Sequence, residues 1–396
     1  MIVFFYLVFS FFLIFKFRIS IPLLFIYSGS IFILGILTFS DEVFIRYLKL
    51  NLISNMFLLF GFYIGKIFNK KHNYINFVSF NYKGILYFYI FSSLLILVHY
   101  FLIGIPILSA NYDVNRFTLS SSGYGGLPSR IAIYIPMLFF FIWFLIKDKI
   151  NIDKNFKIFL IFFVIIALVL QGHKSSILQL FYATIIAYKF TSDRLKNKLW
   201  ILFIIIFSII FAFVSFKNLS TINNLTLYNY LFDRYTIILH QPGFTLFNLS
   251  KNDFNFFSQN IILSDLLYPL LKFLNFDVQT LNDQLSRIVY GIIYKDDFSV
   301  PVTPGWFSYH YFVFGNNIFL TMFLSLLFGT FLSIVENYGL NSNNFHVKVI
   351  SLYVLYFSYV GYTSGNFYYL VINVVFCFVI FLAFYLYKLP NIKNEI

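Results

Sequence analysis

The residues best suited to chemistry in this chain are arginines that lie in polar segments between apolar runs. Arg116 and Arg130 flank the glycine-rich stretch SSSGYGG at 120–126, while Arg234 and Arg287 lie further along, in a longer polar segment. An arginine side chain presents a planar fork of donors, which binds phosphate oxygens two at a time. A glycine-rich backbone can also approach an anion closely. The pattern therefore predicts a binding site for a phosphate or diphosphate group.

A lysine in a tight turn between two apolar runs adds a further basic element. In the sequence QGHKSS, at 171–176, Gly172, His173 and Lys174 directly precede the expected start of a helix, which Ser175 can cap. Free backbone amides and the positive end of the helix dipole make such a helix start favourable for an anion. Lys174 therefore joins the four arginines as a predicted anion-binding residue.

Two other residues form a candidate acid–base pair. If the segment 227–240 is helical, Asp233 and His240 lie on one face, two turns apart. Histidine accepts a proton from a hydroxyl group near neutral pH. We therefore expect Asp233 and His240 to act together in catalysis, with His240 as the base.

Each of these residues also has a plain structural interpretation, which the sequence leaves open. The arginines would then pair with Asp113 or with lipid headgroups, and an isolated histidine is most often part of a core. His310 competes with His240 for the role of base, but its neighbours Trp306, Tyr309 and Tyr311 favour an aromatic belt at the membrane surface.

Signatures of metal or cofactor chemistry are missing from the sequence. There is no Walker sequence, no H-E-x-x-H and no Cys/His cluster, and the single cysteine, Cys377, lies inside an apolar run. We therefore expect no metal, no cofactor and no disulfide framework. The middles of the apolar runs hold almost no ionisable residues, and Lys66 and His99 lie near run ends, where such side chains reach the surface. This pattern disfavours an ion-coupled transporter.

The elements that must position these residues are transmembrane helices. Of the 396 residues, 60% are hydrophobic and only 11% are charged, and 59 Phe and 31 Tyr supply more apolar surface than a soluble domain could bury. The composition predicts an all-α polytopic membrane protein, with residues 1–396 forming a single integral membrane domain. The formal charge of +13 belongs mostly to lysines that flank apolar runs, so we do not expect a nucleic-acid partner.

Apolar runs long enough to cross the bilayer as helices predict about 11 spans, within a range of 10 to 12. The first, sixth, seventh and tenth of these runs are short. The expected spans are 2–15, 20–39, 50–68, 84–104, 127–146, 156–171, 175–190, 199–216, 317–335, 347–362 and 367–387.

The orientation follows from the basic residues in the short connections. One side carries most of the lysines, so we expect it to be cytoplasmic, with the C-terminus inside and the N-terminus outside. Of the seven arginines, only Arg18 and Arg194 fall on that side. Three of the expected cytoplasmic groups are runs of basic residues, from Lys66 to Lys83, from Lys147 to Lys157 and from Lys189 to Lys198. The others are the pair Lys16 and Arg18, the single residue Lys348, and the pair Lys388 and Lys393.

Two loops then face outward, a short one at 105–130 and a long one at 217–316. The long loop contains three amphipathic stretches, at 227–240, 264–276 and 280–291. In the last of these, Thr280 and Asp283 have the spacing of an N-terminal cap, and Gly291 can end the helix. Asp283 and Arg287 also have the spacing of a helical surface pair, which would explain both.

Three segments of the sequence resemble, in the same order, a family of bacterial O-antigen and capsule repeat-unit polymerases (Wzy-type), which are related to the O-antigen ligases. LIGIPILSANYDVNRFTLSSSGYGGLPSR, at 102–130, is similar to the first outer loop of that family. LQGHKSSILQL, at 170–180, resembles its Gly-Ser-Arg-type turn, with Lys174 at the Arg position. VTPGWFSYHYFVFGNN, at 302–317, resembles the segment before a late span. The Arg-x10-Gly pattern of the family is not met strictly, because Gly126 comes one residue early after Arg116.

The resemblance implies a metal-independent membrane glycosyltransferase of the bacterial inner membrane. It would polymerise oligosaccharide repeat units linked to undecaprenyl diphosphate at the periplasmic face, with the diphosphate as leaving group. In this scheme His240 deprotonates the acceptor hydroxyl. Its partners would be the lipid-linked glycan and the bilayer, together with a flippase and a chain-length regulator. The cations assigned to the departing diphosphate are Arg116, Arg130, Lys174, Arg234 and Arg287.

Other functions compete with this one. An O-antigen ligase would use the same chemistry to transfer glycan to the lipid A core. A flippase for lipid-linked oligosaccharides would be expected to have 12 to 14 spans around a charged central cavity and no long outer loop. A glycosyltransferase that uses polyprenyl-monophosphate sugars would usually place an acidic pair such as Asp41 and Glu42 in a longer first outer loop.

Overall fold

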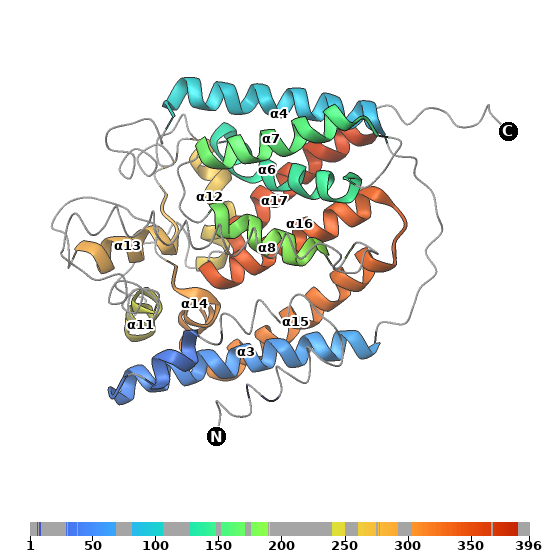
Figure 1. Ribbon diagram of the computed structural model, residues 1–396. Helices are drawn as coiled ribbons and strands as arrows, with labels where there is room; N and C mark the ends of the chain where they lie inside the picture. Colours follow the sequence, from blue (N-terminus) through green and yellow to red (C-terminus); the bar gives the residue numbers. More distant parts are fainter. Residues whose placement is uncertain are drawn as a thin grey trace, which may run out of the picture.

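A computed structural model describes the larger part of the chain, and its regular structure there is entirely α-helical (Figure 1). Within these residues there is no strand, so the predicted all-α class is confirmed for them. The described residues are 6, 8, 29, 31–37, 39–68, 81–105, 127–147, 152–170, 176–188, 190, 240–249, 260–274, 276, 278–291, 303–365 and 367–386.

Eight helices that correspond to predicted spans form the bundle in the described part of the chain. They coincide closely with the predicted runs from 50–68 to 175–190 and from 317–335 to 367–387. Apart from residues 6 and 8, the expected span at 2–15 lies outside the described residues, as do the span at 199–216 and most of that at 20–39. The count of about eleven therefore stays a prediction. The eight helices are α3 (Glu42–Phe68), α4 (Tyr82–Ile103), α6 (Leu127–Ile146), α7 (Lys154–Leu170), α8 (Ser176–Tyr188), α15 (Ile318–Asn341), α16 (Phe345–Ser364) and α17 (Phe367–Leu386).

Four helices among the described residues are long and apolar enough to cross a membrane. They comprise Glu42–Ile67, Tyr82–Phe101, Ile318–Asn341 and Phe367–Leu386. Large apolar side chains on their outer faces are exposed, for example Phe101 at 88% and Phe319 at 87%. Exposed apolar surface of this kind suits contact with lipid, as expected for a helical membrane protein.

α3 begins at Glu42, well before the expected residue 50, because Asp41 caps its first turn. The Asp41 Oδ1 atom accepts hydrogen bonds from the backbone N–H groups of Val43 (2.9 Å) and Phe44 (3.3 Å). The helix is therefore extended at the end where the sequence predicted only a short polar connection.

α3 and α15 run parallel and pack closely. A Cβ atom at Gly61 would lie 1.9 Å from the Leu326 carbonyl oxygen, and one at Gly329 would lie 1.9 Å from that of Leu58. Small residues at these positions let the two backbones meet, as is usual for helix pairs in membranes. The parallel direction agrees with the predicted alternation of spans, in which both helices run from the outside inward.

A buried ion pair joins the far ends of the same two helices. Lys66 Nζ lies 2.9 Å from Glu336 Oε1, and the two side chains are 12% and 1% exposed. Lys66 thus lies near the end of its span, as the sequence indicated, and its ammonium group pairs with a carboxylate of the neighbouring helix. Glu336 lies inside α15, which continues beyond the predicted end at residue 335, and its carboxylate holds the ammonium group in the bundle.

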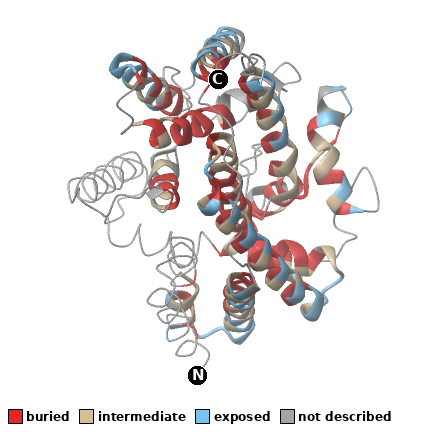
Figure 2. Ribbon diagram, turned by 90° about the vertical axis from the view of Figure 1, so that its right-hand side faces the viewer, coloured by how far each residue is buried: buried red, intermediate tan, exposed pale blue. Residues whose placement is uncertain are grey.

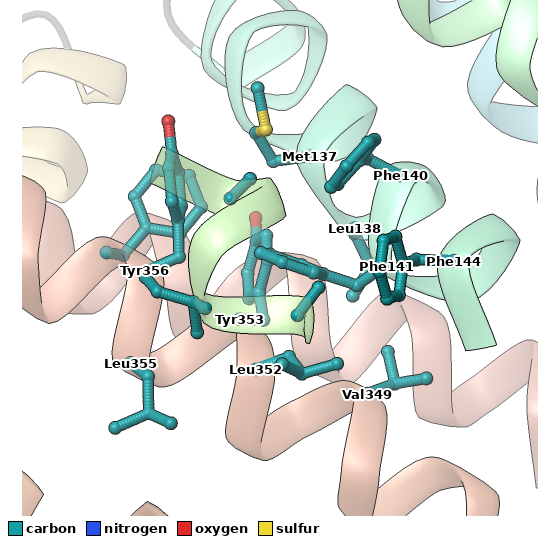
Figure 3. Packing of buried hydrophobic residues seen from close by; sticks show 14 of the residues in the cluster. Met137, Leu138, Phe140, Phe141, Phe144, Val349, Leu352, Tyr353, Leu355 and Tyr356 are labelled. Carbon is teal, nitrogen blue, oxygen red and sulfur yellow. The ribbon is translucent and has the colours of Figure 1, made fainter. Parts of the chain in front are cut away.

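The main core is formed by buried side chains of all eight of these helices, together with Trp306. In Figure 3, Leu138 and Phe141 of α6 face Val349, Leu352 and Tyr353 of α16. The buried residues follow the inward faces of the helices, as Figure 2 shows. Asn81, which caps the start of α4, also donates a hydrogen bond to the Tyr385 carbonyl near the end of α17. The start of one helix thus lies beside the end of the other, which shows that α4 and α17 are antiparallel.

Four short helices complete the described fold, and α11, α13 and α14 lie at one end of the bundle, on the left in Figure 1. Leu246 of α11, Leu285 of α13 and Phe312 of α14 belong to a small core of their own. The four helices are α11 (Gln241–Asn248), α12 (Ile261–Phe273), α13 (Leu281–Gly291) and α14 (Gly305–Val313).

The amphipathic stretches predicted at 264–276 and 280–291 are the helices α12 and α13. The predicted cap of α13 is also confirmed. The Thr280 N–H donates to Asp283 Oδ2, and the Asp283 N–H donates to Thr280 Oγ1, both at 3.1 Å. This reciprocal pair satisfies two backbone donors that the first helical turn leaves without partners. Of the stretch 227–240, only His240 lies within the described residues.

Candidate functional site

A cavity of about 140 Å³ lies where α3, α11, α14 and α16 meet the segment 31–37. Its wall is partly aromatic and partly polar. The apolar and aromatic lining consists of Ile31, Phe32, Trp306, Phe307 and Tyr362, with Pro304. The polar lining consists of Tyr47, Asn51, His240, Thr303 and Thr363, with the backbone of Gly305.

His240 is the predicted site residue that the structure places in this cavity. It directly precedes α11, whose first turn contains Pro242, a residue suited to a helix start. The imidazole is 3% exposed, and it lies beside the rings of Phe32 (5.0 Å between centroids) and Phe44 (6.3 Å). The polar imidazole of His240 therefore lies in an apolar environment.

The electrostatics of His240 follow from this burial. Desolvation lowers its pKa from 6.5 to about 4, while a hydrogen bond with the Ile31 backbone acts in the opposite direction. A hydrogen bond that an imidazole N–H donates to a backbone carbonyl raises the pKa of the ring. The bond with Ile31 has this effect, so the protonated ring nitrogen of His240 is the one that takes part in it. Nε2 is buried without a hydrogen-bond partner among the described residues. At neutral pH His240 is thus an uncharged imidazole, and no described group bonds to the lone pair of its enclosed Nε2 atom.

One wall of the cavity depends on a close approach of α11. A Cβ atom at Gly243 would lie 2.2 Å from the Tyr47 hydroxyl oxygen and 2.5 Å from the Pro304 carbonyl oxygen. The Tyr47 hydroxyl in turn lies 3.4 Å from Ser308 Oγ, and Asn51 Nδ2 donates to the Tyr47 carbonyl at 3.0 Å. Glycine at 243 is therefore what allows α11 to bring His240 to the cavity.

Another part of the wall is a stack of aromatic rings around Trp306. The indole stacks on Phe328 (4.4 Å between centroids) and Tyr362 (5.6 Å), and its Nε1 donates to Ser325 Oγ at 3.0 Å. Ser325 in turn shares a 2.8 Å hydrogen bond with Ser54 of α3. The indole is thus held both by stacking and by a chain of hydroxyl groups, which fixes its orientation.

The predicted aromatic belt around His310 was wrong. Trp306 is 4% exposed, and Tyr309 and His310 are fully buried. These side chains of α14 therefore point into the protein interior and do not face lipid headgroups. His310 Nδ1 lies 2.8 Å from the Trp306 carbonyl oxygen, and its Nε2 lies 3.0 Å from the Tyr368 hydroxyl. Both ring nitrogens of His310 are therefore engaged, unlike Nε2 of His240.

Two glycines shape the rim of the cavity. Gly305 and Gly365 both have positive φ values, 78° and 73°, and a Cβ atom at Gly365 would lie 2.9 Å from the Gly305 carbonyl oxygen. The start of α14 therefore rests directly on the end of α16. Thr303 and Thr363 on this rim are exposed, so the cavity reaches the surface beside them.

A second buried polar group, which the sequence reasoning did not single out, is bonded to α14, one of the helices that form the cavity. Asp265 of α12 accepts hydrogen bonds from the Tyr309 hydroxyl (2.6 Å) and from the Leu281 N–H (3.0 Å). Burial raises the Asp265 pKa from 3.8 to about 6, and hydrogen bonding to Tyr309 opposes the shift. The signal was present in the sequence, because Asp265 is the only acidic residue in the apolar run IILSDLLYPLLKF.

The other predicted site residues are not brought together by the described structure. Arg130 lies in the first turn of α6 and Arg287 lies in α13, but their side chains are outside the described part. The anion site and the Asp233–His240 pair therefore stay predictions. Arg116, Lys174, Asp233 and Arg234 lie outside the described residues altogether.

No cluster of three or more His, Cys, Asp or Glu residues able to hold a metal ion occurs in the part of the chain that the structure describes. Fold and site together define a helical membrane protein with a small polar cavity at one end of its bundle. Comparisons of the chain with protein-family models, with curated proteins and with solved structures find no match.

Proposed function

We propose that this protein is a polysaccharide repeat-unit polymerase of the O-antigen or capsule type, a membrane glycosyltransferase that works at the outer face of the bacterial inner membrane. The observation that carries the proposal is the uncharged His240, whose Nε2 atom has no partner among the described residues, beside a cavity at one end of the bundle. The distribution of lysines predicts that this end faces outward.

The reaction uses the arrangement as follows. His240 Nε2 accepts the proton of the acceptor hydroxyl, and the oxygen forms a bond to the anomeric carbon of the donor glycan. The bond between that carbon and the diphosphate breaks, and the undecaprenyl diphosphate leaves with the electron pair. The proton then passes from the imidazole to water, which restores the neutral base.

The leaving group needs positive charge, because no metal takes part in the scheme. Arg116, Arg130, Lys174, Arg234 and Arg287 supply it in the proposal, through charge-assisted hydrogen bonds to the diphosphate oxygens.

The position of the cavity favours this function over the flippase. A flippase requires a charged path near the middle of its spans, whereas the described cavity lies at one end of the bundle and its described lining contains no charged side chain. The O-antigen ligase remains the alternative, since it differs from the polymerase only in its acceptor. The two are separated by the product that accumulates.

The test is complementation of a strain from which the gene is deleted. That strain should carry single repeat units and no long polymer, and wild-type protein should restore the ladder. His240→Gln should reduce polymerisation by roughly 10²- to 10⁴-fold, the range for loss of a positioned base. His99→Gln is the matched control, because His99 is also a buried histidine, at 8% exposure, but belongs to α4 and not to the cavity.

Polymer length on a gel, divided by the membrane abundance of each variant, is the measurement. A full ladder from His240→Gln would overturn the proposed mechanism. Long polymer that stays on its lipid carrier in the deletion strain would identify a ligase instead.

A further inference from the structure

The size of the cavity beside His240 limits what it can hold. Its volume is about 140 Å³, and cavities of roughly 150 Å³ in proteins hold one six-membered ring such as benzene. A chain of several sugars or a polyprenyl tail would not fit. The space is that of one ring.

The lining of the cavity determines the chemistry of that ring. Asn51 offers an amide oxygen that accepts and an amide nitrogen that already donates to the Tyr47 carbonyl. The hydroxyl groups of Thr303 and Thr363 can accept, while that of Thr363 donates to backbone carbonyls of its own helix. Trp306 and Tyr362 contribute aromatic surface to the same lining. A ring with apolar faces and hydroxyl groups at its edge matches this combination, which is the usual design of small-molecule sites.

Charge argues against a phosphate in the same place. None of the described lining residues is Lys or Arg, and the described part of the wall thus offers a diphosphate no cation. Bringing an unpaired anion into such a site would cost several kcal/mol. The donor diphosphate therefore belongs elsewhere.

One residue of the lining, His240, carries a buried polar atom that has no partner among the described residues. His240 is 97% buried, as its exposed fraction is 3%, and its Nε2 lacks a hydrogen-bond partner in the described part of the chain. A buried polar atom of this kind is costly unless something satisfies it. A hydroxyl group on a bound ring would do so.

We propose that the cavity between α3, α11, α14 and α16 is the acceptor subsite, which binds the single uncharged terminal sugar ring of the acceptor and directs one of its hydroxyl groups at His240 Nε2. This assignment rests on the proposed polymerase function. It separates the acceptor sugar from the diphosphate, and it places specificity for the acceptor in Asn51, Thr303 and Thr363.

The experiment is direct binding to the purified full-length protein in lipid nanodiscs. The probe is the single repeat unit released from the host's surface polysaccharide by partial acid hydrolysis, which carries no diphosphate. Wild-type protein should bind it, and Asn51→Ala and Thr363→Val should each weaken binding by roughly 3- to 10-fold, as expected for one lost hydrogen bond. Inorganic pyrophosphate should not displace the probe.

Thr330→Val serves as the matched control for Thr363→Val. Both hydroxyl groups donate to backbone carbonyls of their own helix, Leu326 for Thr330 and Val360 for Thr363. Thr330 lies on the α3–α15 contact, outside the cavity lining, and its substitution should leave the affinity unchanged. Size-exclusion profiles establish that Asn51→Ala is folded, and Thr363→Val tests the site independently if it is not.

Three results would overturn the assignment: no binding by the wild type, equal binding by both cavity variants, or displacement of the probe by pyrophosphate. Failure of the polymerase function looks different. If the probe binds with the expected pattern but the deletion strain still makes normal polymer, the sugar subsite stands and the polymerase does not. If the protein polymerises repeat units but does not bind the probe, the polymerase function stands and the sugar subsite does not.

Discussion

The hydroxyl of Tyr309 donates a hydrogen bond of 2.6 Å to Asp265 Oδ2, although the two residues are 44 positions apart in the chain. The other carboxylate oxygen accepts from the backbone N–H of Leu281 at 3.0 Å. One carboxylate thus joins α12, α13 and the cavity helix α14. Asp265 and Tyr309 are 2% and 0% exposed, so water contributes little to their solvation.

This contact predicts how stability depends on pH. A carboxyl group whose pKa is raised on folding, here from 3.8 to about 6, contributes stability that is fully present below pH 3.8. That contribution is lost as the pH rises through about 6. Asp265→Asn removes the titration. The wild type should therefore lose about 1.4 kcal/mol per pH unit relative to this variant between pH 4 and 6.

Unfolding temperatures of both proteins in detergent at pH 4, 5, 6 and 7 measure this difference. His240 and His310, whose pKa values are lowered to about 4 by burial, act in the opposite sense, since protonation below pH 6.5 destabilises the fold. Both proteins retain these histidines, so the comparison isolates Asp265. The exposed Asp153→Asn variant is the control. Parallel pH profiles for the wild type and Asp265→Asn would contradict the prediction.

The ion pair between Lys66 and Glu336 predicts a second effect. Lys66→Met leaves the Glu336 carboxylate, which is 0% exposed, without its cation. Breaking a buried pair in this way costs about 3–5 kcal/mol. The double variant Lys66→Met/Glu336→Gln should recover most of the loss, because neither charge is then buried alone.

Thermal unfolding of the wild type, both single variants and the double variant gives the coupling energy. Lys49→Met is the control, as Lys49 lies on the same helix but is exposed. If the single and double variants lost the same stability, the pair would be no more than a surface contact.

The parallel packing of α3 and α15 predicts that Gly329→Ala destabilises the bundle. The added methyl would lie 1.9 Å from the Leu58 carbonyl oxygen and 2.8 Å from the Phe62 nitrogen. Backbone atoms cannot rotate away, so the helices must separate, at a cost of about 1–3 kcal/mol. Leu327→Ala on the exposed face of α15 should have little effect. Membrane abundance and unfolding temperature measure both variants, and normal values for Gly329→Ala would argue against the close approach.

Substitution of arginine by lysine tests the predicted anion site, because the two side chains have the same charge but a different donor geometry. If Arg116 and Arg234 bind the diphosphate through paired donors, Arg→Lys keeps the charge and loses the fork, at a cost of roughly 10²- to 10³-fold in rate. Lysine should therefore be nearly as harmful as alanine at both positions. Lys174→Arg should retain activity, since arginine keeps the positive charge and adds paired donors. The measurement is the polymer ladder at equal abundance, and wild-type ladders from Arg116→Ala and Arg234→Ala would place the diphosphate elsewhere.

Much of the described architecture could be predicted from the sequence, because each local signal acts within its own segment. Apolar runs such as 84–104 and 367–387 differ from α4 and α17 by only a few residues at their ends. The reciprocal cap of Thr280 and Asp283 is equally local. In both cases the hydrogen bonds that form the element lie within a few residues, so the pattern along the chain contains the necessary information.

The candidate site was predictable only in part. The sequence indicated His240 from its residue type and its place in a polar segment. Its burial between Phe32 and Phe44, its unpartnered Nε2 atom and the cavity beside it depend on segments about 200 residues apart. For His310 the sequence was misleading. Its aromatic neighbours suggested a position at the membrane surface, whereas the fold places them in a core.

By itself, the sequence determined that this chain is a helical membrane protein, where most of its described helices lie, and which residue types could bind an anion or accept a proton. The tertiary structure decided which side chains meet. Lys66 pairs with Glu336, Tyr309 with Asp265, and His240 lines a cavity, because each contact joins segments that are distant in the chain. A hydrophobic run is enough to predict a membrane helix. The orientation of that helix about its own axis and the choice of its neighbours depend on packing over the whole bundle.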